Sequence, residues 1–133
     1  MKPKDYPDSS EKSFLKGRID SFGNAINGIK LIIGGEKNFR IHLVVLAAVI
    51  AAGIFFRLTT VEWLAIILVS GLVLVSECIN TAIEHLGDAV SEQQNINLKK
   101  AKDTSAAGVL LAAIISVVVG LVIFVPALFR LFR

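Results

Sequence analysis

The hydrophobic and polar positions divide the chain into a polar N-terminal region and three long apolar segments. These segments are Ile41–Phe56, Trp63–Ile83 and Ser105–Phe129. An α-helix rises about 1.5 Å per residue and the hydrocarbon core of a bilayer is roughly 30 Å thick, so the second and third segments are long enough to cross it. The first segment is shorter and must also use Phe39, Arg40 and Arg57, whose side chains can extend towards the interface. The pattern therefore predicts three transmembrane helices.

A second periodicity precedes the first apolar segment. Apolar residues recur there at steps of three and four, at Leu15, Ile19, Phe22, Ile26, Ile29 and Ile33, and charged residues interrupt them. This spacing predicts an amphipathic helix that lies on the cytoplasmic surface of the membrane. Gly34 and Gly35 are expected to end it. Taken alone, the segment is equally compatible with a surface anchor that has no part in catalysis.

Composition agrees with a single membrane domain. The chain has 133 residues, of which 54% are hydrophobic, more than a soluble domain of this length needs. We expect an all-α integral membrane protein with one domain over 1–133. Its parts are a disordered leader at 1–13, a surface helix at 14–34, and transmembrane helices at 36–57, 62–90 and 99–130, the second with a cytoplasmic extension.

The distribution of basic residues predicts the orientation. Eight lysines and arginines precede Ile41, Arg57 alone lies in the first connection, and the second connection holds Lys99, Lys100 and Lys102. By the positive-inside rule, the N-terminus and the connection over 84–104 are cytoplasmic, whereas the C-terminus is outside. Arg130 and Arg133 argue weakly against this orientation. The polar start does not resemble a cleaved signal peptide.

Cysteine content and motifs exclude several classes of function. Cys78 is the one cysteine, so no internal disulfide is possible, and no Cys/His spacing indicates zinc or an iron–sulfur cluster. No nucleic-acid-binding motif is present, and we expect no nucleic-acid partner. Neither GxxxxGK[ST] nor GxGxxG occurs, so a conventional nucleotide-binding fold is excluded.

The second apolar segment ends in a stripe of polar residues. At about 100° per residue, they fall within roughly a 100° arc of one helix. We call this stripe the polar ladder; its members are Glu77, Asn80, Thr81, Glu84 and Asp88. With Trp63 at the outer interface, Glu77 lies about 21 Å along the axis and some 10 Å inside the cytoplasmic boundary. Glu84 lies about 10 Å nearer to the cytoplasm.

An ionisable residue at membrane depth usually faces the protein interior and usually has a function. The alternative is that Glu77 and Asn80 only join helices by hydrogen bonds, and the further carboxylates on the same stripe weaken it. His85 points away from the stripe and is expected at the surface. His42, at the start of the first span, is expected to pack or to lie at the interface and not to act in catalysis.

Phosphoryl transfer from ATP to a lipid hydroxyl fits carboxylates at these two depths. Glu77 is placed to accept the proton of a lipid hydroxyl. Glu36 and Glu84 can hold Mg²⁺, which keeps waters and bridges the phosphates of ATP. Lys99 and Lys102 can offset the remaining phosphate charge.

Three stretches resemble one family. "ECINTAIEHLGDAV", "KDTSAAGVLLAAI" and "NGIKLIIGGEKNFRIH" are similar to the small prokaryotic diacylglycerol kinases, which include the Gram-positive-type undecaprenol kinases. The resemblance covers roughly 14–128. It implies a surface helix and three transmembrane helices per chain, a homotrimeric bundle with active sites between subunits, ATP as co-substrate, Mg²⁺ as cofactor, and the cell membrane of a prokaryote.

The resemblance also implies roles for individual residues. Glu77 matches the general base and Asn80 its polar partner, both beside the lipid. Glu36 and Glu84 match carboxylates that bind the metal and ATP. Lys102 and Asp103 match the pair that contacts ATP phosphates.

Other nucleotide-binding positions of the family differ here. Gly17 aligns with a basic residue, and the adjacent Arg18 can replace it. Asn24 stands where an aromatic residue often stacks on adenine. Gln93 and Asn95 fall in the stretch that often reads "EYHPLA", so the family's histidine contact is missing. We expect these positions to bind ATP with a looser or different nucleotide preference.

The resemblance favours undecaprenol over diacylglycerol as the lipid, because "SFGNAINGIK" and "VVVGLVIFVPAL" are closer to the undecaprenol kinase branch. A diacylglycerol kinase that makes phosphatidic acid is the alternative. Two hypotheses of other classes are a small ion-coupled transporter with Glu77 as its carrier site and a membrane scaffold without catalytic activity.

Overall fold

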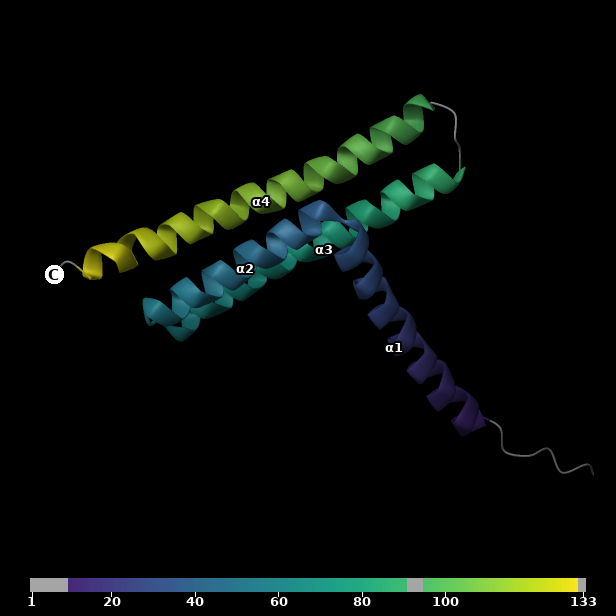
Figure 1. Cartoon of the computed structure of the whole chain (residues 1–133), viewed down its shortest axis with the longest axis horizontal. Helices are drawn as coiled ribbons and strands as arrows, with labels where there is room; N and C mark the ends of the chain where they lie inside the picture. Colours follow the sequence, from purple (N-terminus) through teal and green to yellow (C-terminus); the bar gives the residue numbers. More distant parts are fainter. Residues whose placement is uncertain (1–9, 91–94, 132–133) are drawn as a thin grey trace, which may run out of the picture. The chain divides into compact units, whose positions relative to one another are not determined.

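The computed structural model describes residues 10–90 and 95–131, which contain helices and no strand (Figure 1). The helices are α1 (Ser10–Gly35), α2 (Lys37–Phe55), α3 (Thr60–Val90) and α4 (Ile96–Arg130). Helix α1 begins at Ser10, four residues before the predicted start, and ends at Gly35 as expected. The bounds of α2, α3 and α4 each lie within three residues of the predicted ones. The first part of the predicted leader, 1–9, lies outside the described residues.

The chain divides into two units, of which the first contains α1. The apolar residues predicted to form a stripe on α1 remain uncovered: Ile19, Phe22, Ile26 and Ile29 each expose more than half of their surface. An exposed apolar stripe among charged residues is typical of a helix that lies in a membrane interface.

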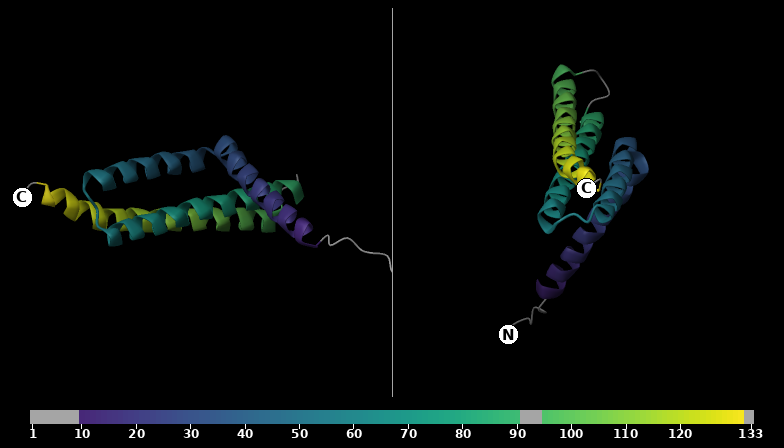
Figure 2. Two further views of the ribbon diagram at one scale, coloured as in Figure 1. Left: turned by 90° about the horizontal axis from the view of Figure 1, so that it is seen from below. Right: turned by 90° about the vertical axis from the view of Figure 1, so that its left-hand side faces the viewer.

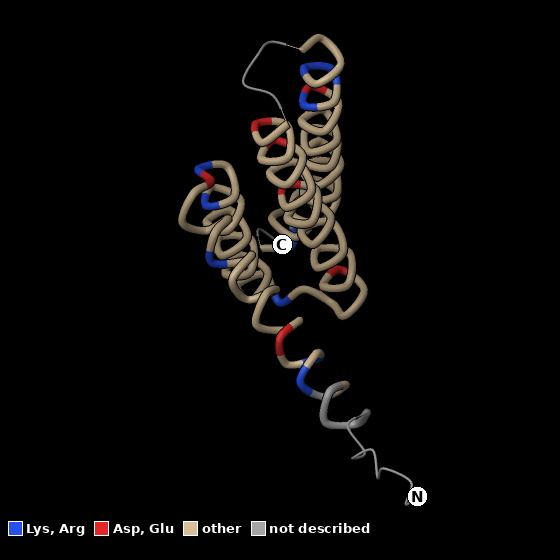
Figure 3. Tube along the Cα trace, turned by 90° about the vertical axis from the view of Figure 1, so that its right-hand side faces the viewer, with Lys and Arg blue, Asp and Glu red and all other residues tan. Residues whose placement is uncertain are grey.

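The second unit, Glu36–Arg133, contains three helices, each of which runs antiparallel to the one before it in the chain. Helices α3 and α4 run side by side over most of their length, and α2 packs against α3 (Figure 2). Helices α2, α3 and α4 are each long and apolar enough to cross a membrane, as predicted. Charged residues of these helices lie mostly towards the helix ends (Figure 3), as a bilayer favours. Glu77, near the middle of α3, is an exception.

A tight turn joins α2 to α3. Arg57 adopts a left-handed conformation with φ of 53°, which is uncommon for a residue other than glycine, asparagine or aspartate. The next helix begins with a capping box, in which Glu62 Oε2 accepts from the backbone N–H of Thr59 at 2.7 Å. Arg130 at the end of α4 lies 3.2 Å from Glu62. These contacts fix the three helices to one another at the end remote from the polar ladder.

The apolar core of the second unit lies beside this turn. Leu58, Ile66, Ile123 and Ala127 form its buried centre. Gly53 of α2 contacts the indole of Trp63 on α3, and a Cβ added at Gly53 would lie 2.7 Å from its Cη2 atom. The missing side chain therefore permits α2 and α3 to approach closely, as small residues do in membrane helix pairs.

Replacement of Gly53 by alanine tests this close approach. Gly53→Ala gains up to about 1 kcal/mol of helix propensity but must displace Trp63, and overpacking typically costs about 1–3 kcal/mol. We expect a net loss of about 1 kcal/mol, measured by thermal unfolding in detergent micelles. Gly71→Ala is the matched control, because nothing lies within 4 Å of its Cβ position. Equal or higher stability of Gly53→Ala would contradict this packing.

Candidate functional site

The polar ladder of α3 faces the inside of the bundle, as predicted. Glu77 exposes 3% of its surface, and Asn80 and Thr81 each expose 7%. Glu84 is partly buried and Asp88 is exposed, while Cys78 points outwards. The ladder therefore runs from a buried carboxylate to an exposed one over about three turns of helix.

A chain of hydrogen bonds links the ladder to α4. Ser105 Oγ donates to Asn80 Oδ1 at 2.7 Å, and Asn80 Nδ2 donates to Glu84 Oε1 at 2.9 Å. Both the oxygen and the nitrogen of the Asn80 amide therefore form hydrogen bonds. The bonds hold the carboxylate of Glu84 through its Oε1 atom.

His42 of α2 contacts the buried end of the ladder. Its Nε2 atom lies 3.3 Å from Oε1 of Glu77. His42 was expected to pack or to lie at the interface, and its contact with Glu77 was not predicted, because the pattern of a single helix does not indicate contacts with a neighbouring helix. The sequence does contain one indication of this contact. His42 and Glu77 are separated by similar numbers of residues from the short connection between two antiparallel helices.

A cavity of about 360 Å³ adjoins the ladder. Its polar lining comes from α2 and α3, namely Asn38, His42, Glu77, Asn80 and Glu84. Helix α4 contributes small or apolar residues, among them Ala106 and Val109. The cavity therefore brings the predicted base, its polar partner and one predicted metal-binding carboxylate to a common space.

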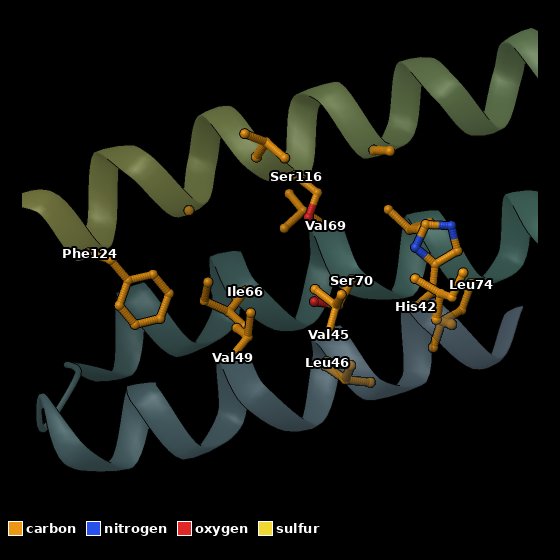
Figure 4. Close-up of a pocket in the computed structure, with 15 residues that line it drawn as sticks. His42, Val45, Leu46, Val49, Ile66, Val69, Ser70, Leu74, Ser116 and Phe124 are labelled. Atoms are coloured by element: carbon orange, nitrogen blue, oxygen red, sulfur yellow. The ribbon is translucent and has the colours of Figure 1, made fainter. Parts of the chain in front are cut away.

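A second pocket, of about 320 Å³, lies deeper between α2, α3 and α4 (Figure 4). It is almost wholly apolar, with Val45, Val49, Ile66 and Phe124 among its lining residues. Ile41, His42 and Ala113 line both spaces. The polar cavity at Glu77 and the apolar pocket towards the bilayer centre thus match a molecule with a polar head and a hydrocarbon tail.

Glu36 lies directly before α2, and its side chain makes no capping hydrogen bond to that helix. Its Oε1 atom is 4.0 Å from Nε2 of His85, which is largely exposed, as predicted. Both Glu36 and Glu84 lie within electrostatic reach of Glu77. Among the described residues, no group of three or more His, Cys, Asp or Glu side chains is arranged to hold a metal ion.

Two lysines begin α4 near the exposed end of the ladder. Lys102 pairs with Asp88 across the two helices, and Lys99 pairs with Asp103 at 3.6 Å. The Lys102 side chain passes over Gly87, where an added Cβ would lie 2.7 Å from its Cε atom. Sequence reasoning did not identify Gly87, which provides the space that this lysine occupies.

The other predicted nucleotide-binding residues are dispersed. Gly17 and Asn24 share one face of α1, and Arg18 lies over the ring of Phe14 at 5.0 Å. Asn95 caps α4, because its Oδ1 atom accepts from the backbone N–H of Asn97 at 2.9 Å. Gln93 lies outside the described residues.

Comparison with known proteins places this site in a family. The family model for prokaryotic diacylglycerol kinase matches residues 23–124. An undecaprenol kinase of Bacillus subtilis is 38% identical over 108 residues, which cover 81% of this chain and 88% of that protein. A diacylglycerol kinase of Synechocystis is 38% identical over 112 residues, which cover 84% of this chain and 64% of that protein.

These matches include α2, α3 and most of α4, and with them the whole polar ladder. They support an enzyme and not the transporter or scaffold that the sequence left open. The chain belongs to the prokaryotic diacylglycerol kinase family and is a membrane-bound lipid kinase.

Proposed function

We propose that this protein transfers the γ-phosphoryl group of ATP to the hydroxyl of undecaprenol, with Mg²⁺ as cofactor. The observation that carries the proposal is the buried carboxylate of Glu77, which lines a polar cavity that shares lining residues with an apolar pocket. A lipid alcohol occupies both spaces at once, with its hydroxyl at Glu77 and its chain in the apolar pocket.

In this reaction the lipid oxygen forms a bond to the γ-phosphorus, and the bond from that phosphorus to the β–γ bridging oxygen breaks to release ADP. Glu77 takes the hydroxyl proton as general base. Asn80 holds Glu84 by a hydrogen bond and keeps the polar wall of the cavity in place.

Glu36 and Glu84 are the residues that would hold Mg²⁺. Two carboxylates suit this ion, because Mg²⁺ usually keeps several waters and takes further oxygens from the phosphates of its substrate. The absence of a larger ligand cluster among the described side chains agrees with that mode. When bound, the ion would neutralise charge on the β- and γ-phosphates.

ATP approaches from the end of the bundle where α3 ends and α4 begins. Lys102 and Asp103 are proposed to contact its phosphates, and Lys102 exchanges Asp88 for a phosphate oxygen. We also propose that three residues of α1 contact the nucleotide. They are Arg18 and the pair Gly17 and Asn24, which share one face of the helix. The basic residues of the N-terminal region and of the α3–α4 connection support a cytoplasmic location for this end.

The walls beside Glu77 support a polyisoprenoid alcohol as the lipid. Of the three residues that line both spaces, Ile41 and Ala113 are apolar and His42 is the one polar residue. The hydroxyl of undecaprenol is followed directly by hydrocarbon, whereas diacylglycerol carries two esters that require polar partners. The Bacillus relative named undecaprenol kinase also aligns over more of its own length than the Synechocystis diacylglycerol kinase does.

Assembly as a homotrimer completes the proposal. Helices α2, α3 and α4 leave many large apolar side chains exposed, such as Val44, Leu68 and Val122. These surfaces can contact lipid or other copies of the chain.

The first prediction concerns Glu77. Glu77→Gln keeps the shape but cannot accept a proton, so kcat for lipid phosphorylation should fall by about 10²–10⁴-fold. Binding of ATP and assembly should persist. Cys78→Ser is the matched control on the outward face of α3. Turnover at the wild-type rate in Glu77→Gln would show that another group is the base.

The second prediction concerns Glu84. Glu84→Gln removes a charged oxygen ligand, so the Mg²⁺ concentration for half-maximal activity should rise by about tenfold or more. A magnesium titration at fixed ATP measures this change. Glu62→Gln, at the other end of α3, should leave the half-saturating concentration unchanged. An unaltered magnesium requirement in Glu84→Gln would argue against its assignment as a ligand.

The third prediction identifies the lipid. With radiolabelled ATP and both lipids in mixed micelles, kcat/KM should be at least about tenfold higher for undecaprenol than for diacylglycerol. Gly120→Leu fills the apolar pocket and should lower kcat/KM for undecaprenol about tenfold. Gly108→Leu, also on α4 with open space at its Cβ position, is the control. A preference for diacylglycerol would instead support a diacylglycerol kinase.

A further inference from the structure

His42 is the basic side chain that the structure places against Glu77. The two residues come from different helices and meet at 3.3 Å between Nε2 and Oε1. Their accessibility differs: the Glu77 side chain exposes 4% of its surface, whereas the His42 side chain exposes 24%. The imidazole also lines both the polar cavity and the apolar pocket.

The other charged groups around Glu77 do not provide the same contact. Glu36 from the start of α2 and Glu84 from α3 are both acidic. The part of α4 that lines the cavity carries no titratable residue. Farther along α4, Lys102 pairs with Asp88 and Lys99 with Asp103. Within the described parts of the chain, His42 is therefore the base in contact with Glu77.

A buried general base must lose its proton before the next reaction can begin. Glu77 has almost no surface through which water could remove that proton. The imidazole is a suitable intermediate because neutral histidine accepts a proton near neutral pH. It contacts Glu77 with one nitrogen and is itself several times more accessible.

We propose that His42 receives from Glu77 the proton that the lipid hydroxyl releases and passes it to water. This role rests on the proposed function, in which Glu77 is the base. In each cycle the lipid O–H bond breaks, the oxygen bonds to the γ-phosphorus, and ADP leaves with the electrons of the broken phosphorus–oxygen bond. The proton moves to Glu77, then to Nε2 of His42. The ring then holds a proton on each nitrogen and loses one to water.

Two variants of His42 separate proton transfer from positioning. His42→Gln places an amide N–H near the Nε2 position but cannot carry a proton, so it preserves the contact with Glu77. We expect its kcat to fall at least about tenfold and to lose part of the wild-type pH dependence. His42→Ala should fall similarly and recover activity when imidazole is added. The same imidazole should not restore Glu77→Gln, which serves as the control.

Two results would overturn the proposal. One is a kcat for His42→Gln that equals the wild-type value at every pH. The other is a failure of imidazole to raise the activity of His42→Ala, which would leave His42 with a positioning role alone. Wild-type protein that phosphorylates neither lipid would refute the proposed function itself, whereas active wild-type protein with an unaffected His42→Gln refutes only the relay.

A measurement without lipid phosphorylation tests the contact directly. The chain has two histidines, so ¹⁵N-histidine NMR of the full-length protein in micelles gives two ring systems, and His85→Gln assigns them. Glu77→Gln should change the ring ¹⁵N chemical shifts of His42 and leave those of His85 in place. Unchanged shifts for His42 would show that the two groups do not interact.

Discussion

The burial of one carboxylate inside a membrane helix constrains the rest of this structure. An ionisable group at that depth costs several kcal/mol unless other polar groups meet it. Here the partners come from all three long helices: His42 of α2 contacts Glu77, and Ser105 of α4 reaches the same ladder through Asn80. The bundle therefore closes around its polar residues at one end, while an apolar core and the ion pair of Arg130 with Glu62 join the helices at the other.

The proposed function makes use of this division of the bundle. Polar contacts lie where nucleotide, metal and lipid head group would meet, and the apolar core lies where a rigid support is needed. The apolar pocket occupies the space between them and opens beside Glu77 through shared lining residues. Substitutions in this pocket can therefore alter which lipid binds, even where the substituted residue does not contact the groups proposed to perform phosphoryl transfer.

Much of the fold and part of the site could be predicted from the sequence. The helices follow from runs of apolar residues, and the inward face of the polar ladder follows from the helical period, which is a property of a single helix. His42, Ser105 and Gly87 could not be assigned in this way, because their contacts depend on the register between neighbouring helices. Repetition along one helix does not encode that register. Asn95 was assigned to ATP by resemblance, and the structure adds that its side chain caps α4.

The turn between α2 and α3 has a consequence at the opposite face of the membrane. Its left-handed residue, its capping box and the contact between Gly53 and Trp63 set how α2 is rotated and shifted along α3. One residue more or fewer in this turn would rotate a helix by about 100°, enough to turn His42 away from Glu77. The alignment of the groups that would move a proton at one side of the membrane thus depends on the length of a short connection at the other side.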